Sequence, residues 1–186
     1  MGYETYCRLL SEVVSEEEGI LPEEKNIVSV DIKVNGYIGN DYIEDEEARL
    51  DIYQKISRVE TQEDAFEVVD ELVDRYGDVP DNVDNLIKIS RIRYLCSKCG
   101  IDSVIEKQGN VQFMVNSEGK PFYATMQNFI SDMNFIREYG NRVKFMPFKE
   151  PYLMFKCKTE DKISEIIAFL EGILKFYHCQ KAKTNI

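Results

Sequence analysis

Three amphipathic segments between residues 41 and 93 constrain the fold more than any other part of the sequence. The middle segment repeats apolar residues at helical spacing, and the Thr61 hydroxyl can cap its first turn. Gly77 ends this segment and suits a left-handed C-terminal cap, while Pro80 keeps the next helix from extending backwards. We therefore predict three helices joined by short connections, at about 45–58, 61–76 and 81–99.

The middle helix is expected to bury one face and to expose an acidic one. The residues predicted in or beside its apolar stripe are Ala65, Phe66, Val68, Val69, Leu72, Val73 and Tyr76. The acids predicted on the opposite face are Glu63, Glu67, Asp70 and Asp74, with Glu71 alongside. Several of these acids are four residues apart, where like charges destabilise a helix by about 0.2–0.5 kcal/mol per pair, and we expect them to lack a compensating cation at this spacing. Such a face is either a solvated surface or a docking surface for a basic partner.

Strands and further helices are predicted on both sides of this helical region. Alternating apolar residues predict a strand over 28–34, a hairpin over 104–115 around Gly109-Asn110, and a strand pair over 142–146 and 152–157. Further helices are predicted near Tyr6–Val14, from Pro121 to about Met133, and from Thr159 to about Tyr177. The fold class is therefore α+β: a helical cluster packed with antiparallel strand pairs in a single compact domain.

Charge is unevenly distributed along the chain, whose formal net charge is −11. Residues 41–84 contain sixteen acids and four bases, whereas residues 85–186 contain ten acids and sixteen bases. An acidic front argues against nonspecific binding of nucleic acid by the whole surface. It leaves open a weak nucleic-acid site on the basic half, and the candidate residues for it are Lys88, Arg91, Arg93 and Lys98.

Catalytic and cofactor motifs are absent from the sequence, so we expect no enzymatic activity and no cofactor in this chain. Cys96 and Cys99 form a lone C-x-x-C, and a zinc site would need His178 and Cys179 as further ligands. We predict no bound metal. No apolar run approaches the roughly 20 residues that cross a bilayer, and the N-terminus lacks the pattern of a signal peptide, so we expect a cytoplasmic protein.

Two motifs in the helical region carry a resemblance to a known family. The pattern DYIxDxxxRLxxYxxI begins at Asp41, and ELxDRYGxxPxxVxNLxxIxRIR begins at Glu71. Together they resemble the C-terminal (TRCF) domain of bacterial transcription-repair coupling factors. The similarity extends from about Tyr3 to Leu174, and the D-R-Y-G-x-x-P element is its most specific part. One departure is Gly39, because the family usually has a proline ahead of the DYI element.

The resemblance implies a domain layout and a function. Residues 1–24 would form a connecting helix and linker, residues 25–180 the TRCF domain, and residues 181–186 a frayed tail. Coupling factors are ATP-dependent DNA translocases that remove stalled RNA polymerase and recruit nucleotide excision repair. The terminal domain is a non-catalytic, autoinhibitory clamp on the UvrB-like N-terminal module, where it masks the surface that docks UvrA.

The partner implied for this chain is therefore the UvrB-like module of the same protein, with UvrA affected indirectly. RNA polymerase and DNA would contact other domains. The residues expected at the contact are Glu71 and Asp74, supported by Glu67 and Asp70. The alternatives are a free-standing acidic interaction module and a weak nucleic-acid binder.

Overall fold

The computed structural model describes residues 28–115, 137–146 and 150–184, with side chains as far as residue 176. These residues belong to two compact units, each with its own core. The first unit contains Val34–Arg91, and the second contains Val28–Lys33 and the chain from Ile92 onward. Within the described ranges, no helix combines the length and the apolar character needed to cross a membrane.

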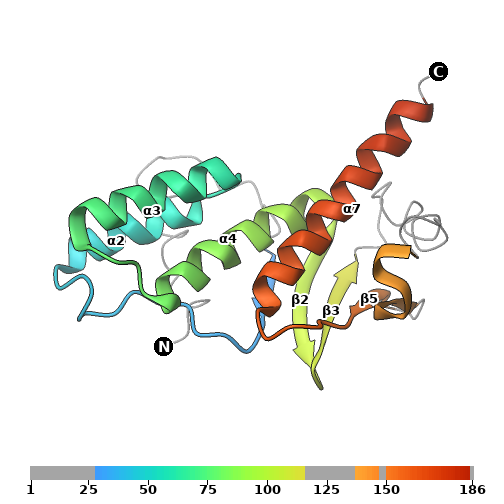
Figure 1. Ribbon diagram of the computed structural model, residues 1–186, viewed down its shortest axis with the longest axis horizontal. Helices are drawn as coiled ribbons and strands as arrows, with labels where there is room; N and C mark the ends of the chain where they lie inside the picture. The colour runs from blue at the N-terminus through green and yellow to red at the C-terminus, as the bar shows by residue number, and fades with distance from the viewer. Residues whose placement is uncertain (1–27, 116–136, 147–149, 185–186) are drawn as a thin grey trace. The chain divides into compact units, whose positions relative to one another are not determined.

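The first unit is built from helices, and their bounds confirm the predicted three. They are α2 (Glu46–Ser57), α3 (Gln62–Tyr76) and α4 (Asp81–Cys99), the last of which continues into the second unit. α2 and α3 lie side by side (Figure 1). Asp45 caps α2 by accepting a hydrogen bond from the Ala48 N–H at 2.7 Å. The enclosed side chains that hold the three helices together are Ile43, Ile52, Ile56, Leu72, Val83 and Leu86.

The second unit contains a five-stranded sheet in the order β1-β2-β3-β5-β4. Its strands are β1 (Ser29–Asp31), β2 (Ile101–Lys107), β3 (Asn110–Val115), β4 (Val143–Met146) and β5 (Tyr152–Phe155). The predicted hairpin and the predicted strand pair are both present and antiparallel. β1 is an exception, because it pairs with β2 in parallel. The predicted antiparallel pairs are therefore confirmed, and the parallel pairing of β1 adds to them: the helical region is a connection long enough to return the chain in the same direction. The α+β class is confirmed.

The long helix α7 (Lys162–Thr184) covers one face of this sheet (Figure 1). Phe169 on α7 stacks on Phe155 of β5 with a centroid distance of 4.5 Å, and it lies 5.4 Å from the ring of Phe113 on β3. All three rings are buried, so they form the centre of this core. The predicted end of the helix near Tyr177 was wrong, because the residues that follow include good helix formers such as Gln180, Lys181 and Ala182 and the helix continues through them.

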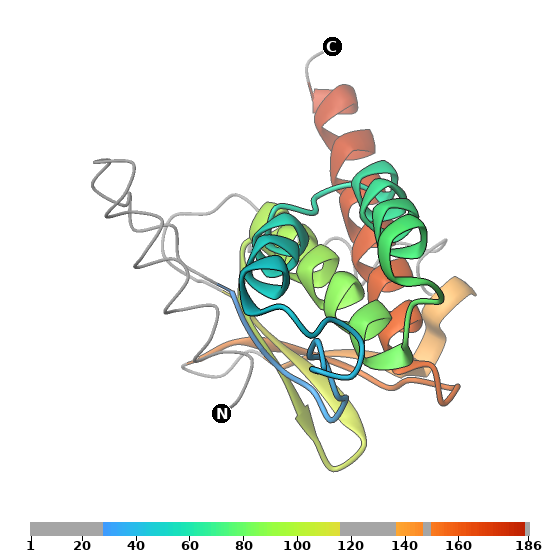
Figure 2. The same cartoon turned by 90° about the vertical axis from the view of Figure 1, so that its left-hand side faces the viewer.

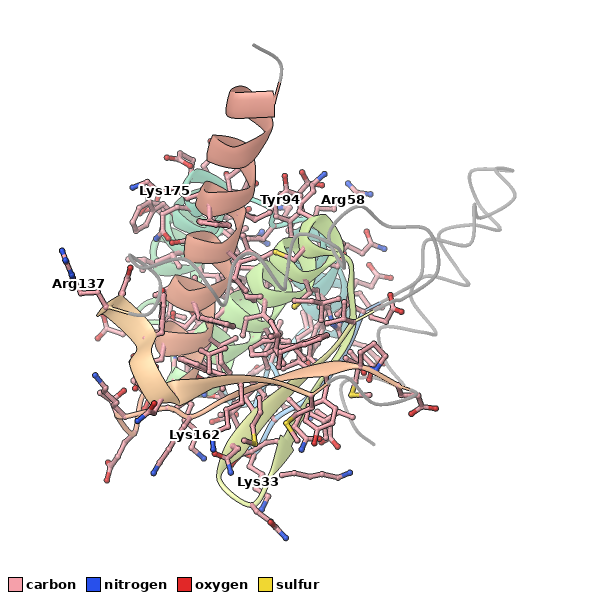
Figure 3. The ribbon with its side chains drawn as sticks, turned by 90° about the vertical axis from the view of Figure 1, so that its right-hand side faces the viewer. Lys33, Arg58, Tyr94, Arg137, Lys162 and Lys175 are labelled. Atoms are coloured by element: carbon pink, nitrogen blue, oxygen red, sulfur yellow. The ribbon has the colours of Figure 1, made fainter. Side chains whose placement is uncertain are left out.

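Glu106 on β2 joins three segments of the second unit. One of its carboxylate oxygens accepts a hydrogen bond from Lys162 Nζ at 2.6 Å, and the other accepts one from the Lys33 backbone N–H at 3.0 Å. Lys33 and Lys162 are both labelled at the lower end of Figure 3. The Lys162 hydrogen bond, followed by the Lys33 N–H, holds the pKa of Glu106 below its usual value. This carboxylate therefore stays ionised and fixes the start of α7 against the sheet.

A tight turn joins β2 to β3, and it is the yellow-green tip at the bottom of Figure 2. Lys107 pairs with Asn110, so the two turn residues are Gln108 and Gly109 rather than the predicted Gly109-Asn110. Both have positive φ angles, 51° for Gln108 and 75° for Gly109, as a type I′ hairpin turn requires.

Two predicted helices lie outside the described residues. They are the segment near Tyr6–Val14 and the segment from Pro121 to about Met133. The proposed division at residues 24 and 180 also remains a prediction.

Candidate docking surface on α3

Local hydrogen bonds fix the start of α3. Thr61 Oγ1 accepts a hydrogen bond from the Asp64 N–H at 3.1 Å, and Asp64 Oδ2 accepts one from the Thr61 N–H at 2.8 Å. This reciprocal pair is a capping box, and it confirms the predicted start of the helix. Backbone N–H groups of Thr61 and Glu60 lower the pKa of Asp64 by stabilising its ionised form.

The end of α3 is fixed by Gly77 and by two tyrosines. Gly77 has the positive φ that was predicted, 83°, but its ψ of −158° differs from a left-handed helical cap. The Tyr42 hydroxyl donates to the Gly77 carbonyl oxygen at 3.3 Å, and the Tyr42 and Tyr76 ring centroids are 6.0 Å apart. With both ends held, the rotation of α3 about its axis is defined, and so is the face it presents to solvent.

The inner face of α3 is narrower than predicted. Ala65, Val68 and Leu72 are buried as expected, and Leu72 is fully enclosed. Phe66 and Val73 were expected beside them, but their exposed fractions are 58% and 46%. The expectation was wrong because these two residues lie just past the edge of the stripe that Ala65, Val68 and Leu72 form on the helix.

The outer face carries four exposed acids, which we call the acidic stripe: Glu63, Glu67, Asp70 and Asp74. Spacings of four, three and four residues place them on one side of the helix. Within the described parts of the chain, none of these four side chains takes part in an ion pair or a hydrogen bond. The acidic stripe is therefore a surface of uncompensated negative charge.

Glu71 differs from the acidic stripe, although the sequence grouped it with these residues. Its carboxylate oxygens lie 2.7 and 3.0 Å from Lys55 Nζ on α2. Arg75 is one turn along α3, and its Nη1 lies 2.6 Å from Glu71 Oε1. Hydrogen bonds from Lys55 and then from Arg75 lower the pKa of Glu71. The expectation that these acids lack a cation at four-residue spacing was wrong for Glu71, since Arg75 occupies that position.

Comparison with known proteins identifies the family. A family model described as the TRCF domain matches residues 32–125, which is half of the chain. The chain belongs to the TRCF domain family. It is 32% identical over 118 residues to a transcription-repair-coupling factor of Staphylococcus epidermidis, a match that covers 62% of this chain and 10% of the relative. A Staphylococcus haemolyticus relative of the same name is 31% identical over 120 residues, 63% of this chain and 10% of its own length.

A solved structure has the same fold as this TRCF domain. It is the crystal structure of the C-terminal domain of a transcription-repair coupling factor, with a TM-score of 0.66 and 19% sequence identity. The match covers 80% of this chain and 92% of that one. By contrast, this TRCF domain spans about a tenth of the length of the curated relatives.

The basic residues considered for nucleic-acid binding are partly engaged within the TRCF domain. Lys88 pairs with Asp84 at 2.7 Å, and Arg91, which is only 9% exposed, donates to Gln62. Lys98 lies over the Tyr94 ring, 4.8 Å from its centroid. Arg93 also has an interaction partner. Each of these four residues therefore already has a contact within the domain, although Lys98 remains exposed, and the nucleic-acid alternative stays a prediction.

The C-x-x-C pair of the TRCF domain lies in a core. Cys96 and Cys99 are fully buried, and burial raises the pKa of Cys99 to about 12 and that of Cys96 well above its usual value. No group of three candidate metal ligands occurs among the described side chains, but those of His178 and Cys179 are not among them. The absence of a metal therefore stays a prediction.

Proposed function

We propose that this TRCF domain is the C-terminal regulatory domain of a transcription-repair coupling factor and acts as a non-catalytic clamp. Its partner is the UvrB-like N-terminal module of the same protein, and docking covers the surface that binds UvrA. The observation that carries the proposal is the acidic stripe, a rigidly held helix face with unpaired acids, of which Asp74 lies inside the ELxDRYG motif that carries the family resemblance. Such a face attracts a surface rich in lysine and arginine.

The contact is built from Asp74, Asp70 and Glu67, with Glu71 at its edge. Glu71 is about 30% exposed, and its charge is shared between Lys55 and Arg75, so it can reach a partner only while it remains bound to them. Asp74 has no such constraint within the described residues. Exposed ion pairs stabilise a contact by about 0–1 kcal/mol each, so this clamp is weak enough to open and sensitive to salt.

Opening of the clamp links this contact to DNA repair. When the domain releases the UvrB-like module, UvrA gains access and excision repair is recruited. RNA polymerase and DNA contact other parts of the longer protein, which supplies the ATP-driven translocation. The isolated chain lacks a phosphate-binding loop, and we expect it to hydrolyse no ATP.

The test measures the affinity of UvrA for the full-length wild-type protein and for two single variants of it, Asp74→Ala and Glu71→Ala. Loss of about 1.4 kcal/mol of clamp energy would raise the open population about tenfold, so UvrA should bind more tightly by up to that factor. Glu47→Ala is the matched control, because Glu47 is an exposed acid in the first turn of α2 and lies outside the acidic stripe. Equal UvrA affinity in all four proteins, with the fold intact, would refute the clamp.

A further inference from the structure

Three large hydrophobic side chains are conspicuously exposed in the described part of the chain, and two of them are on α3. Phe66 is 58% exposed and Val73 is 46% exposed, while the third, Tyr37, lies outside the helices. Residues seven apart return to nearly the same side of a helix, and at a rise of about 1.5 Å per residue these two are about 10 Å apart along the axis. Phe66 and Val73 thus form a short apolar strip, which we call the apolar pair.

The apolar pair borders the acidic stripe directly. Asp70 is four residues after Phe66 and three before Val73, so its carboxylate lies beside both. The remaining acids, Glu63, Glu67 and Asp74, continue around the helix in the same direction. Half-buried Val69 and Tyr76 lie on the other side of the pair, at the edge of the core. Around α3 the order is therefore core, apolar pair, acids.

We propose that the apolar pair is the anchor of the docking surface, and that it fits a protein surface whose apolar recess is bordered by lysine and arginine side chains. This inference rests on the proposed function and assigns a different source to the affinity. In protein interfaces most of the binding energy comes from a few side chains that become fully desolvated, and charged groups at the rim contribute mainly to association rate and specificity. Phe66 and Val73 supply the first role, and the acidic stripe supplies the second.

Charge complementarity selects this partner over two others. A second copy of the chain would bring four acids against four acids at the same contact, and like charges at that range repel. Nucleic acid would oppose its phosphates to the same carboxylates. A surface with cations around an apolar recess satisfies both parts of the α3 face at once.

Titration calorimetry tests the assignment, with the purified UvrB-like module of the same protein as the probe. The chain is compared with Phe66→Ser and Val73→Ser at low and at high salt. We expect Phe66→Ser to weaken binding about tenfold or more and Val73→Ser to weaken it less, because valine buries a smaller area. The salt dependence of affinity should stay unchanged in both variants, since no charge is removed. The heat-capacity change on binding should become less negative, as expected when less apolar surface is buried.

Tyr37→Ser is the matched control. Tyr37 is 54% exposed in the same unit, and it contacts Asn82 only through its backbone N–H and carbonyl groups. This variant should bind like the wild-type chain. The double variant Asp70→Asn, Asp74→Asn should show the complementary behaviour. Its affinity should depend less on salt, and its loss of affinity relative to the wild-type chain should be smaller at high salt than at low salt.

The outcomes separate the two proposals. If the wild-type chain binds and Phe66→Ser, shown to be folded by circular dichroism, binds equally well, the anchor is refuted while the clamp stands. If the wild-type chain does not bind the module at all, both are refuted. Self-association seen by sedimentation would also overturn the inference if Phe66→Ser abolished it. Binding of duplex DNA that Phe66→Ser abolished would do the same, because the apolar pair would then serve another occupant.

Discussion

Lys55 Nζ lies 2.7 Å and 3.0 Å from the two carboxylate oxygens of Glu71, and this contact joins α2 to α3 across sixteen residues of sequence. Asp51 completes the arrangement, 3.0 Å from the same ammonium group. The Lys55 pKa is raised by its hydrogen bonds to Glu71 and then to Asp51, the counterpart of the lowered pKa of Glu71. The contact separates Glu71, which stabilises the first unit, from the four acids of the acidic stripe, which face solvent.

This division predicts opposite effects of two neutralising substitutions on stability. Glu71→Gln should lower the free energy of unfolding by about 0.5–1 kcal/mol, because Lys55 and Arg75 both lose their shared partner. Asp74→Asn should leave stability unchanged or raise it slightly, because Asp74 faces Asp70 four residues away and lies near the negative end of the helix dipole. Urea unfolding at neutral pH and low salt measures both. If the two variants were equally destabilised, the pairing of Glu71 with Lys55 and Arg75 would give it no stabilising role beyond that of any other acid on the helix.

Much of α3 could be predicted from sequence because its ends are set locally. Thr61 and Asp64 are three residues apart and cap each other, and Gly77 follows the last turn, so both signals lie in one short stretch. Which of its surface residues form ion pairs, and which apolar ones stay exposed, could not be predicted in the same way. Lys55 reaches Glu71 from another helix, and the exposure of Phe66 depends on how the whole first unit packs around α3. The parallel pairing of β1 with β2 likewise depends on a connection of about seventy residues, which no local pattern encodes.

Glu106 predicts a specific pH dependence in the second unit. Its pKa is lowered in the folded protein, so its contribution to stability is present above the unfolded value of about 4.3 and is lost as the pH falls through the lower folded value. Glu106→Gln should therefore destabilise the protein by about 1–3 kcal/mol at pH 7, and the difference from wild type should shrink in acid. Denaturant unfolding from pH 7 to pH 3 gives the profile. Glu160→Gln, an exposed glutamate, is the control and should show no such trend.

The buried cysteines predict low thiol reactivity. A pKa of about 12 leaves Cys99 with roughly one thiolate in ten thousand at pH 8, and burial also blocks access to the reagent. Alkylation of Cys96 and Cys99 should therefore be slow in native protein and fast in denaturant, as followed by mass spectrometry of digested samples.

Elemental analysis of the purified chain should find no stoichiometric zinc. About one zinc per chain that disappears in Cys96→Ser would contradict the predicted absence of a metal.

The turn between β2 and β3 offers a stabilising substitution. Gln108 has a φ of 51°, a left-handed conformation that is unfavourable for most side chains by about 1 kcal/mol, and it is exposed, so its side chain is replaceable. Asparagine tolerates this conformation better, and Asn-Gly is the preferred sequence for a type I′ turn. Gln108→Asn should therefore raise the free energy of unfolding by about 0.5 kcal/mol, a fraction of the cost of holding a non-glycine residue in this conformation. Gln108→Ala is the control: alanine keeps the same unfavourable φ without the local hydrogen bonding of asparagine, so it should bring no gain. Thermal unfolding of the two variants beside wild type decides the point, and an equal rise in both would assign the effect to the removed side chain rather than to the turn.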